Sequence, residues 1–85
     1  MTRRIYSYSI DRCVGKALRL LRKEKRLTLR DLESISDKCH TYFAKVETYE
    51  RRITYGELIN YCNLLELEPI EVYSLAHELE SLENG

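Results

Sequence analysis

Apolar side chains recur every three or four residues along most of this chain, a spacing that places them on one face of a helix. Short polar segments interrupt the pattern, which predicts helices over about residues 10–25, 29–35, 40–48, 55–65 and 69–83. One proline and three glycines leave no stretch with the composition of a linker. The sequence therefore predicts an all-α fold of five helices in a single domain, residues 10–83, with an extended last helix.

Local signals support these helix starts. Thr28 and Thr54 each stand three residues before an acid, Asp31 and Glu57, which is the arrangement of a capping box. Pro69 suits a first helical turn, because its missing N–H would have no partner there. The residues expected to point inward are Val14, Ala17, Leu18, Leu21, Leu32, Ile35, Phe43, Val46, Leu58, Tyr61, Cys62 and Leu65.

Residues 1–9 are expected to form a short N-terminal arm. Apolar and polar residues alternate between Arg4 and Ile10, as in a short strand, but one strand alone is not stable. A packed or flexible arm is favoured, and a basic arm that enters a DNA groove is the alternative. Ser9 or Asp11 is expected to cap the first helix.

The charge of the chain is divided between its two ends. All 14 lysines and arginines lie within residues 3–52, which carry a net charge of +7, whereas residues 53–85 carry −7. Such a division favours a surface that faces a polyanion, with an acidic surface turned away from it. Solvated helix faces that merely differ in charge are the alternative. No apolar run approaches the roughly 20 residues of a membrane span, and no signal peptide is visible, so the cytoplasm is expected.

Three cysteines, Cys13, Cys39 and Cys62, are an odd number without a Cys-x-x-Cys pair. A disulfide framework and a zinc site are therefore not expected, and buried thiols are favoured. No phosphate loop, nucleophile elbow or paired carboxylates are visible, so neither an enzyme nor a cofactor is expected.

The second and third predicted helices, joined by residues 36–39, have the order of a helix-turn-helix, in which the second helix of the unit lies in the major groove. On its outward face Lys45 can donate to guanine and Thr41 can contact a base edge. His40 can donate to a base or a phosphate, and Tyr42 lies to the side. The expected base contacts are thus His40, Thr41, Tyr42 and Lys45.

Cations flank this helix as a phosphate backbone would require. Lys38 precedes it and Arg51 and Arg52 follow it, while Thr28 opens the preceding helix. A solvated polar helix face is the alternative explanation.

Several spaced elements together resemble the phage repressor and Cro type of helix-turn-helix, the xenobiotic-response-element family. They are Gly15, Arg22, Leu27-Thr28, Leu32 and Glu47, within a similarity that covers about residues 14–73. The resemblance implies five helices, base reading by the third, and an ion pair between Arg22 and Glu47. It also places His40, Thr41 and Lys45 at base-reading positions, and Cys39, Arg51 and Arg52 near phosphates.

The sequence departs from that family at four positions. Leu29 stands where the family has a glutamine that holds a phosphate. Glu33 replaces a small alanine, so this face of the helix is either more open or pairs Glu33 with a basic residue. Asp37 and Tyr49 replace glycines in the turn and after the third helix. Asp37 tolerates a left-handed backbone better than Tyr49 does.

The last helix carries an apolar stripe with spacings of three, four and three, like one face of a coiled coil: Val72, Leu75, Leu79 and Leu82. A second row comprises Ile70, Tyr73 and Ala76. One row is expected to face the core, and the stripe of Val72, Leu75, Leu79 and Leu82 is expected to meet a second subunit. Burial of both rows within one subunit is the alternative.

These patterns predict a DNA-binding transcriptional regulator, a homodimeric repressor of a palindromic operator. The partners are double-stranded DNA, a second copy and, further, a regulatory protein. The alternative is a protein-interaction module such as an antitoxin.

Overall fold

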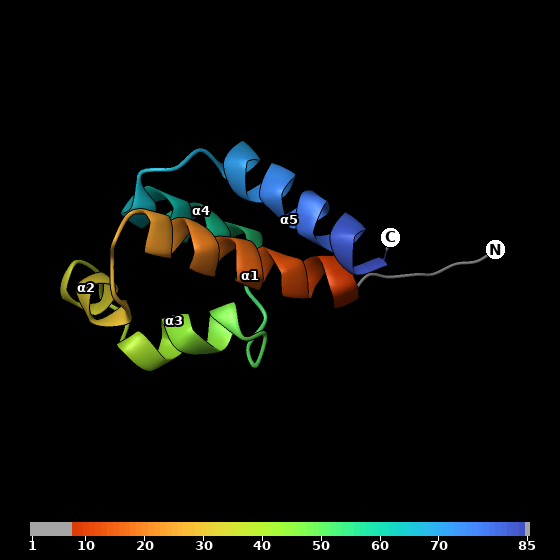
Figure 1. Cartoon of the computed structure of the whole chain (residues 1–85). Coiled ribbons are helices and arrows are strands. Elements are labelled where there is room, and N and C mark those ends of the chain that lie inside the picture. Colours follow the sequence, from red (N-terminus) through yellow and green to blue (C-terminus); the bar gives the residue numbers. More distant parts are fainter. Residues whose placement is uncertain (1–7, 85) are drawn as a thin grey trace.

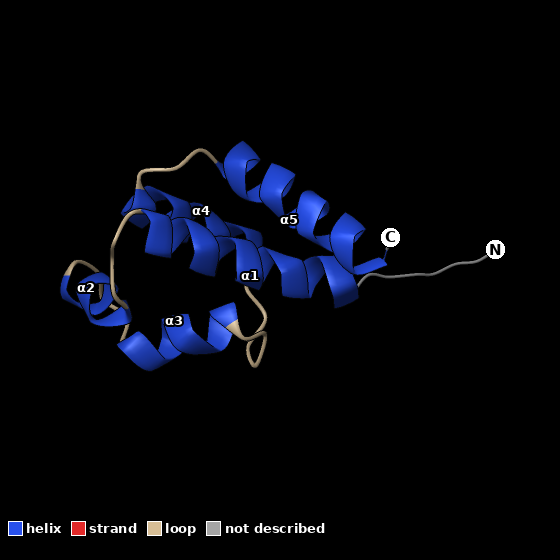
Figure 2. Cartoon of the chain, viewed as in Figure 1, coloured by secondary structure: helices blue, strands red, loops and turns tan. Residues whose placement is uncertain are grey.

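The computed structural model describes residues 8–84, which form five helices and no strand (Figures 1 and 2). The all-α, five-helix prediction is confirmed, and each predicted helix boundary lies within two residues of the observed one. The helices are α1 (Tyr8–Glu24), α2 (Leu29–Ser34), α3 (His40–Glu47), α4 (Tyr55–Leu65) and α5 (Pro69–Asn84). Residues 1–7 of the expected arm lie outside the described residues.

The start of α1 differs from its prediction. The helix begins at Tyr8, so neither Ser9 nor Asp11 is its cap, and the alternating pattern does not make a strand of residues 8–10. Contacts with α5 explain the difference, because the Ser9 hydroxyl donates to the Glu80 carboxylate at 2.6 Å. One turn further along, Arg12 and Lys16 both bind Glu83. The first turns of α1 are thus held by the last turns of α5.

α1 is the central element of the fold, with α5 along one side of it and α3 along the other (Figure 1). The molecule measures 45 × 21 × 18 Å, and its core joins residues from all five helices. The buried apolar residues are Cys13, Ala17, Leu18, Leu32, Phe43, Val46, Tyr61, Cys62, Leu65, Leu67, Val72 and Ala76.

Gly15 lets α1 and α3 approach closely. A Cβ atom at this position would lie 2.6 Å from the Val46 carbonyl oxygen and 2.9 Å from that of Glu47. Those oxygens belong to the backbone of α3 and cannot move aside as a flexible side chain would. Gly15 therefore sets how deeply α3 sits against α1.

Both capping boxes are present as predicted, at Thr28 and at Thr54. The prediction that Ile35 points inward is wrong, since 54% of its surface is exposed. α2 ends one residue earlier than expected, at Ser34, and the non-helical backbone of Ile35 turns its side chain to solvent. Asp37 has no positive φ, whereas Tyr49 does, with φ of 62°.

α5 fully buries one residue from each of its two apolar rows. Val72 and Ala76 are both buried in the core, which corrects the expectation that a whole row would face a partner. Val72 therefore does not belong to a free dimer face, whereas Leu75 and Leu79 are half-buried and Leu82 is 77% exposed. A helix that lies in a groove between two others buries a narrow strip, and this strip runs between the two rows.

Two of the three cysteine thiols are buried and one is exposed. Cys13 and Cys62 are buried as expected, but Cys39 is exposed at the start of α3. Within residues 8–84, no group of three or more histidine, cysteine or acidic side chains comes together as a metal site requires. In the same residues, none of the helices has the length and apolar character needed to cross a membrane.

Candidate nucleic-acid interface

α2 and α3 form a helix-turn-helix held together by apolar contacts. Leu32 of α2 and Phe43 and Val46 of α3 are buried in the shared core. The short segment 35–39 turns the chain sharply between them, and the capping box of Thr28 fixes the start of α2. The unit therefore has one face against the core and one face open.

The buried side of α3 determines which residues point outward. Because Phe43, Val46 and Glu47 are buried, the 3.6-residue period turns Thr41 and Lys45 away from the core. Both side chains are exposed, as their predicted contact with bases requires.

The other two predicted base contacts lie on opposite flanks of α3. His40 is half-buried and lines a groove shared with α1 and α2. Tyr42 is half-buried on the far flank, where its ring packs edge-on against Phe43 at 5.1 Å. The Arg51 guanidinium lies over the same ring, 4.7 Å from its centroid. The structure thus places Thr41 and Lys45 on the open face of α3, His40 on the flank beside α1 and α2, and Tyr42 in packing contacts on the other flank.

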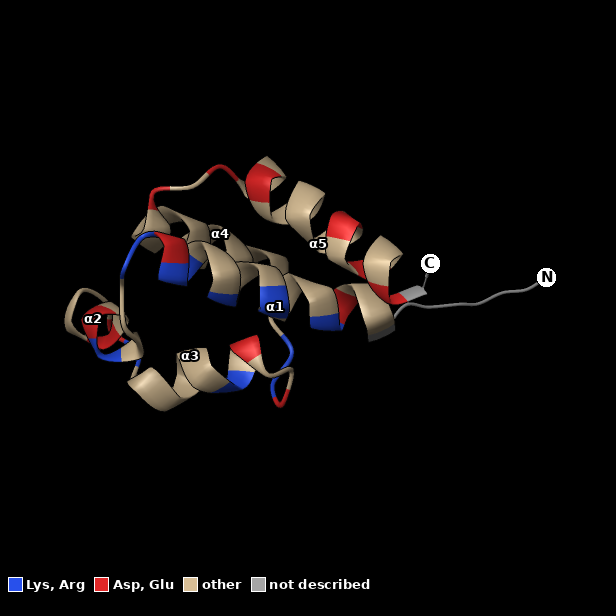
Figure 3. Cartoon of the chain, in the orientation of Figure 1, with Lys and Arg blue, Asp and Glu red and all other residues tan. Residues whose placement is uncertain are grey.

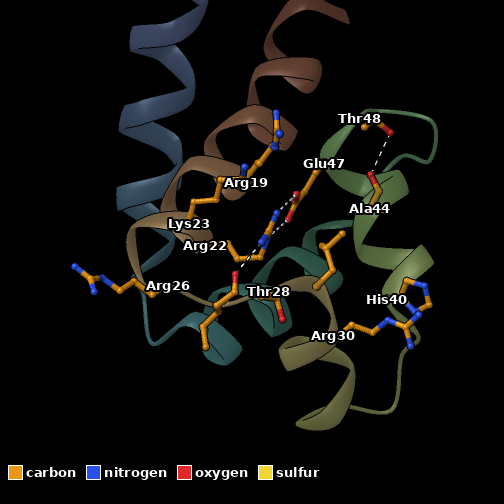
Figure 4. Close-up of a pocket in the computed structure, with 12 residues that line it drawn as sticks. Arg19, Arg22, Lys23, Arg26, Thr28, Arg30, His40, Ala44, Glu47 and Thr48 are labelled. Carbon is orange, nitrogen blue, oxygen red and sulfur yellow. Dashed lines mark hydrogen bonds and ion pairs between the residues drawn. The ribbon is translucent and has the colours of Figure 1, made fainter.

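A groove of about 870 Å³ runs between α1, the start of α2 and α3 (Figure 4). Sequence reasoning did not assign its four exposed cations to the site: Arg19 and Lys23 from α1, Arg26 from the turn after it, and Arg30 from α2. The cluster of basic residues just before the second helix was the available signal. Only the tertiary structure shows that this cluster opens beside His40 and Thr48 of α3.

A buried ion pair closes the inner end of this groove and joins α1 to α3. Arg22 donates to the Glu47 carboxylate through Nε at 2.7 Å and Nη2 at 2.9 Å, which confirms the predicted pair. Arg22 also donates to the Leu27 carbonyl at 2.7 Å, and the Tyr61 hydroxyl donates to Glu47. The hydrogen bond to Glu47 raises the pKa of Arg22, and burial followed by the same carboxylate raises the pKa of Tyr61. Each guanidinium nitrogen of Arg22 and both carboxylate oxygens of Glu47 therefore have a hydrogen-bond partner within the protein.

The predicted phosphate contacts are exposed but not equivalent. The Thr28 hydroxyl lies in the groove and accepts from the Asp31 N–H at 3.0 Å, so its own hydrogen remains for an acceptor. Lys38 and Arg52 are exposed on the other side of α3. The exposed Cys39 contacts the Thr41 hydroxyl, Sγ to Oγ1 at 2.9 Å, and this hydrogen bond lowers the pKa of the thiol.

Arg51 was predicted to contact a phosphate, but its guanidinium is already paired within the protein. Its guanidinium binds the Glu57 carboxylate twice, at 3.0 and 2.9 Å, and donates to the Arg52 carbonyl at 2.9 Å. Glu57 occupies the bidentate position that a phosphate would take, so the charge of Arg51 is compensated within the protein.

Charge is segregated across the molecule. Figure 3 shows blue segments along the side of α1 that faces α3 and in the loop after α3, while red segments mark α5 and the loop before it. The acidic end of the chain thus lies on the opposite side of α1 from the helix-turn-helix.

No protein-family model matches this chain, and no curated protein matches it significantly. Among solved structures, the chain is similar to the crystal structure of the clp gene regulator ClgR from C. glutamicum. The two share 25% sequence identity with a TM-score of 0.77, over 86% of this chain and 94% of the other. The five-helix arrangement is therefore that of a gene regulator over nearly its whole length.

Proposed function

We propose that this protein is a transcriptional regulator that binds double-stranded DNA, with α3 in the major groove. The observation that carries the proposal is the basic groove, which runs along the flank of α3 that carries His40, next to the exposed face with Thr41 and Lys45. A duplex presents base edges between two rows of phosphates, so a reader needs polar side chains in the middle and cations beside them. The fold likeness to a gene regulator supports the same conclusion.

Two groups of residues have separate roles in this proposal. Thr41, Lys45 and His40 contact base edges, and the groove cations contact the phosphate backbone. Lys23 and Arg26 line the groove with Thr28, whose hydroxyl adds a hydrogen-bond donor for a phosphate oxygen.

Selection of bound sequences from a random DNA pool tests the proposal. An enriched sequence is expected, and Lys45→Ala should weaken binding to it by roughly 1–3 kcal/mol with little effect on random DNA. Lys23→Ala and Arg26→Ala should weaken both, each lowering the salt slope by about one. Lys25→Ala removes the same charge from an exposed site outside the groove and is the matched control. Equal losses in all four variants would refute the interface.

We further propose that the regulator is a homodimeric repressor of a palindromic operator. Exposed Leu82 and half-buried Leu75 and Leu79 leave an apolar flank on α5, and Leu20 of α1, 49% exposed, shares a surface hollow with Leu79. A palindromic operator would require this pairing to set two α3 helices about 34 Å apart, one DNA turn. Leu82→Glu changes a side chain that is 77% exposed, so it should leave the fold intact and yield a monomer in sedimentation. A variant that sediments as the wild type does would exclude this flank.

A protein-interaction module is the second candidate function. It is favoured by the compensated charge of Arg51 and by the exposed apolar side chains of Ile70 and Tyr73. Binding to random duplex DNA separates the two candidates, because the affinity of a DNA-binding protein falls steeply with salt. No binding at low salt would favour the interaction module.

A further inference from the structure

Glu33, near the end of α2, contacts the first residue of α3 twice. Its Oε2 atom accepts the backbone N–H of His40 at 3.0 Å and lies 3.2 Å from Nδ1 of the same residue. The residue before the helix, Cys39, makes no capping hydrogen bond with its side chain. Glu33 therefore provides the cap that α3 lacks locally, and it holds the imidazole ring with the same oxygen.

The contact determines which ring nitrogen carries the proton. Hydrogen bonds from His40, first through its backbone and then through its ring, lower the pKa of Glu33, so its carboxylate is ionised at neutral pH. An ionised carboxylate only accepts hydrogen bonds, and therefore Nδ1 must be the donor. In a neutral ring Nε2 then has no hydrogen and is an acceptor.

The surroundings keep this geometry in place. Leu32 and Phe43 are buried between α2 and α3, so the two backbones that carry Glu33 and His40 are fixed relative to one another. Arg30 lies 3.9 Å from the other oxygen of Glu33 and is the second charged group beside the ring. His40 lines the groove, where Figure 4 shows it next to Arg30.

In the major groove the acceptors are N7 and O6 of guanine, N7 of adenine and O4 of thymine, whereas the donors are the amino groups of adenine and cytosine. A ring that presents a bare nitrogen can pair only with a donor. We propose that Glu33 is a specificity-determining residue: when the ring is neutral, it fixes His40 as a hydrogen-bond acceptor that selects the amino group of adenine or cytosine, whereas a protonated ring donates from both nitrogens. This inference rests on the proposed function, since it assigns a chemical preference to one position of the DNA site.

The tautomer is measured without DNA. Nitrogen-15 NMR at pH 8 distinguishes a protonated from a bare ring nitrogen, and His77, whose ring lies against Tyr73 at 4.4 Å, gives a second histidine signal in the same spectrum. His40 should show the proton on Nδ1 in the wild type. Glu33→Gln keeps an oxygen acceptor and should preserve this state, whereas Glu33→Ala should produce a mixture of tautomers.

The base preference is measured at pH 8, as the tautomer is, on the selected DNA sequence at the position where His40→Ala relaxes selection. Replacing the base there by an analogue without its amino group should weaken wild-type binding by roughly two- to tenfold, as for one lost hydrogen bond. Replacing a purine N7 by carbon in the same base pair should leave affinity nearly unchanged. In Glu33→Ala the two analogues should have similar effects. Each result is the ratio of the affinities of one variant for modified and unmodified DNA. The general gain in DNA affinity from losing the negative charge of Glu33 therefore cancels.

Failure of this inference differs from failure of the proposed function. A random pool from which no sequence is enriched would refute sequence-specific regulation and, with it, the base-reading role of His40. A protein that selects a sequence but carries the His40 proton on Nε2 would overturn the role of Glu33 alone. So would a wild-type protein that loses as much affinity from the N7 analogue as from the amino-group analogue.

Discussion

Replacing Glu47 by alanine removes the only carboxylate that neutralises the buried Arg22 guanidinium among the described residues. Glu47 accepts two hydrogen bonds from Arg22 and one from the Tyr61 hydroxyl. The side chains of Arg22 and Glu47 are only 7% and 3% exposed, so water cannot take over these bonds without opening the core. Arg22 would keep its bond to the Leu27 carbonyl.

The magnitude follows from what would remain unpaired. Breaking a buried pair by removing one partner costs roughly 3–5 kcal/mol, because it leaves a buried charge. The hydroxyl of Tyr61 loses its acceptor as well, and an unsatisfied buried group costs roughly 1–3 kcal/mol. Rearrangement of the neighbouring side chains recovers part of the cost of the unpaired Arg22 charge and of the unsatisfied Tyr61 hydroxyl. We expect the free energy of unfolding to fall by roughly 3–5 kcal/mol, a large part of the stability of a small domain.

Urea unfolding followed by circular dichroism measures this loss. Tyr61→Phe, which leaves the ion pair in place, should cost only about 1 kcal/mol and is the matched control. The double variant Arg22→Met with Glu47→Leu removes both charges and should be more stable than Glu47→Ala alone, since no buried charge is left. A Glu47→Ala protein as stable as the wild type, or a double variant less stable than the single one, would refute a buried and satisfied pair.

Three further predictions concern the backbone and the surface. Gly15→Ala should lower stability in urea by roughly 1–3 kcal/mol, because the new methyl group meets the backbone of Val46; unchanged stability would mean that α1 and α3 are not so close. Glu66→Gly should raise the free energy of unfolding by up to about 1 kcal/mol, and with it the midpoint of thermal unfolding, because the exposed Glu66 has φ of 57°. A lower midpoint would contradict the left-handed backbone of Glu66. The pKa of Glu57 is lowered from 4.5 to about 2, first by its hydrogen bond from Arg51. The ionised form of Glu57 therefore stabilises the fold above pH 4.5, and this contribution is lost as the pH falls towards 2. Glu57→Gln should flatten the pH dependence of stability in that range. An unchanged slope would exclude the pair of Arg51 and Glu57.

The sequence determined the helices of this protein because their signals are local. Apolar periodicity, two capping boxes and one proline are read within a few residues, and each acts within the same few residues in the folded chain. The start of α1 was misjudged where a distant contact decides. Ser9 is helical because it meets Glu80 of α5, and no local pattern carries that contact.

The candidate site divides in the same way. Thr41 and Lys45 were assigned from the period of one helix, which the structure confirms as an exposed face. The pair of Arg22 and Glu47 joins residues 25 positions apart and was reached through a resemblance, because residue spacing alone does not specify contacts between helices. Arg51 was misjudged since its partner Glu57 belongs to the next helix.

Only the tertiary structure decided which charges and apolar side chains are available to a partner. The contact strip on α5 buries Val72 and Ala76, partly covers Leu75 and Leu79, and leaves Ile70, Tyr73 and Leu82 exposed, although every member has a similar sequence context. The basic groove likewise exists because Gly15 allows α3 to lie against α1 and so brings α3 beside the cations at the end of α1. Helix formation depends on neighbours along the chain and was therefore set by the sequence. Exposure and charge pairing depend on neighbours in space, which the packing of the helices alone determines.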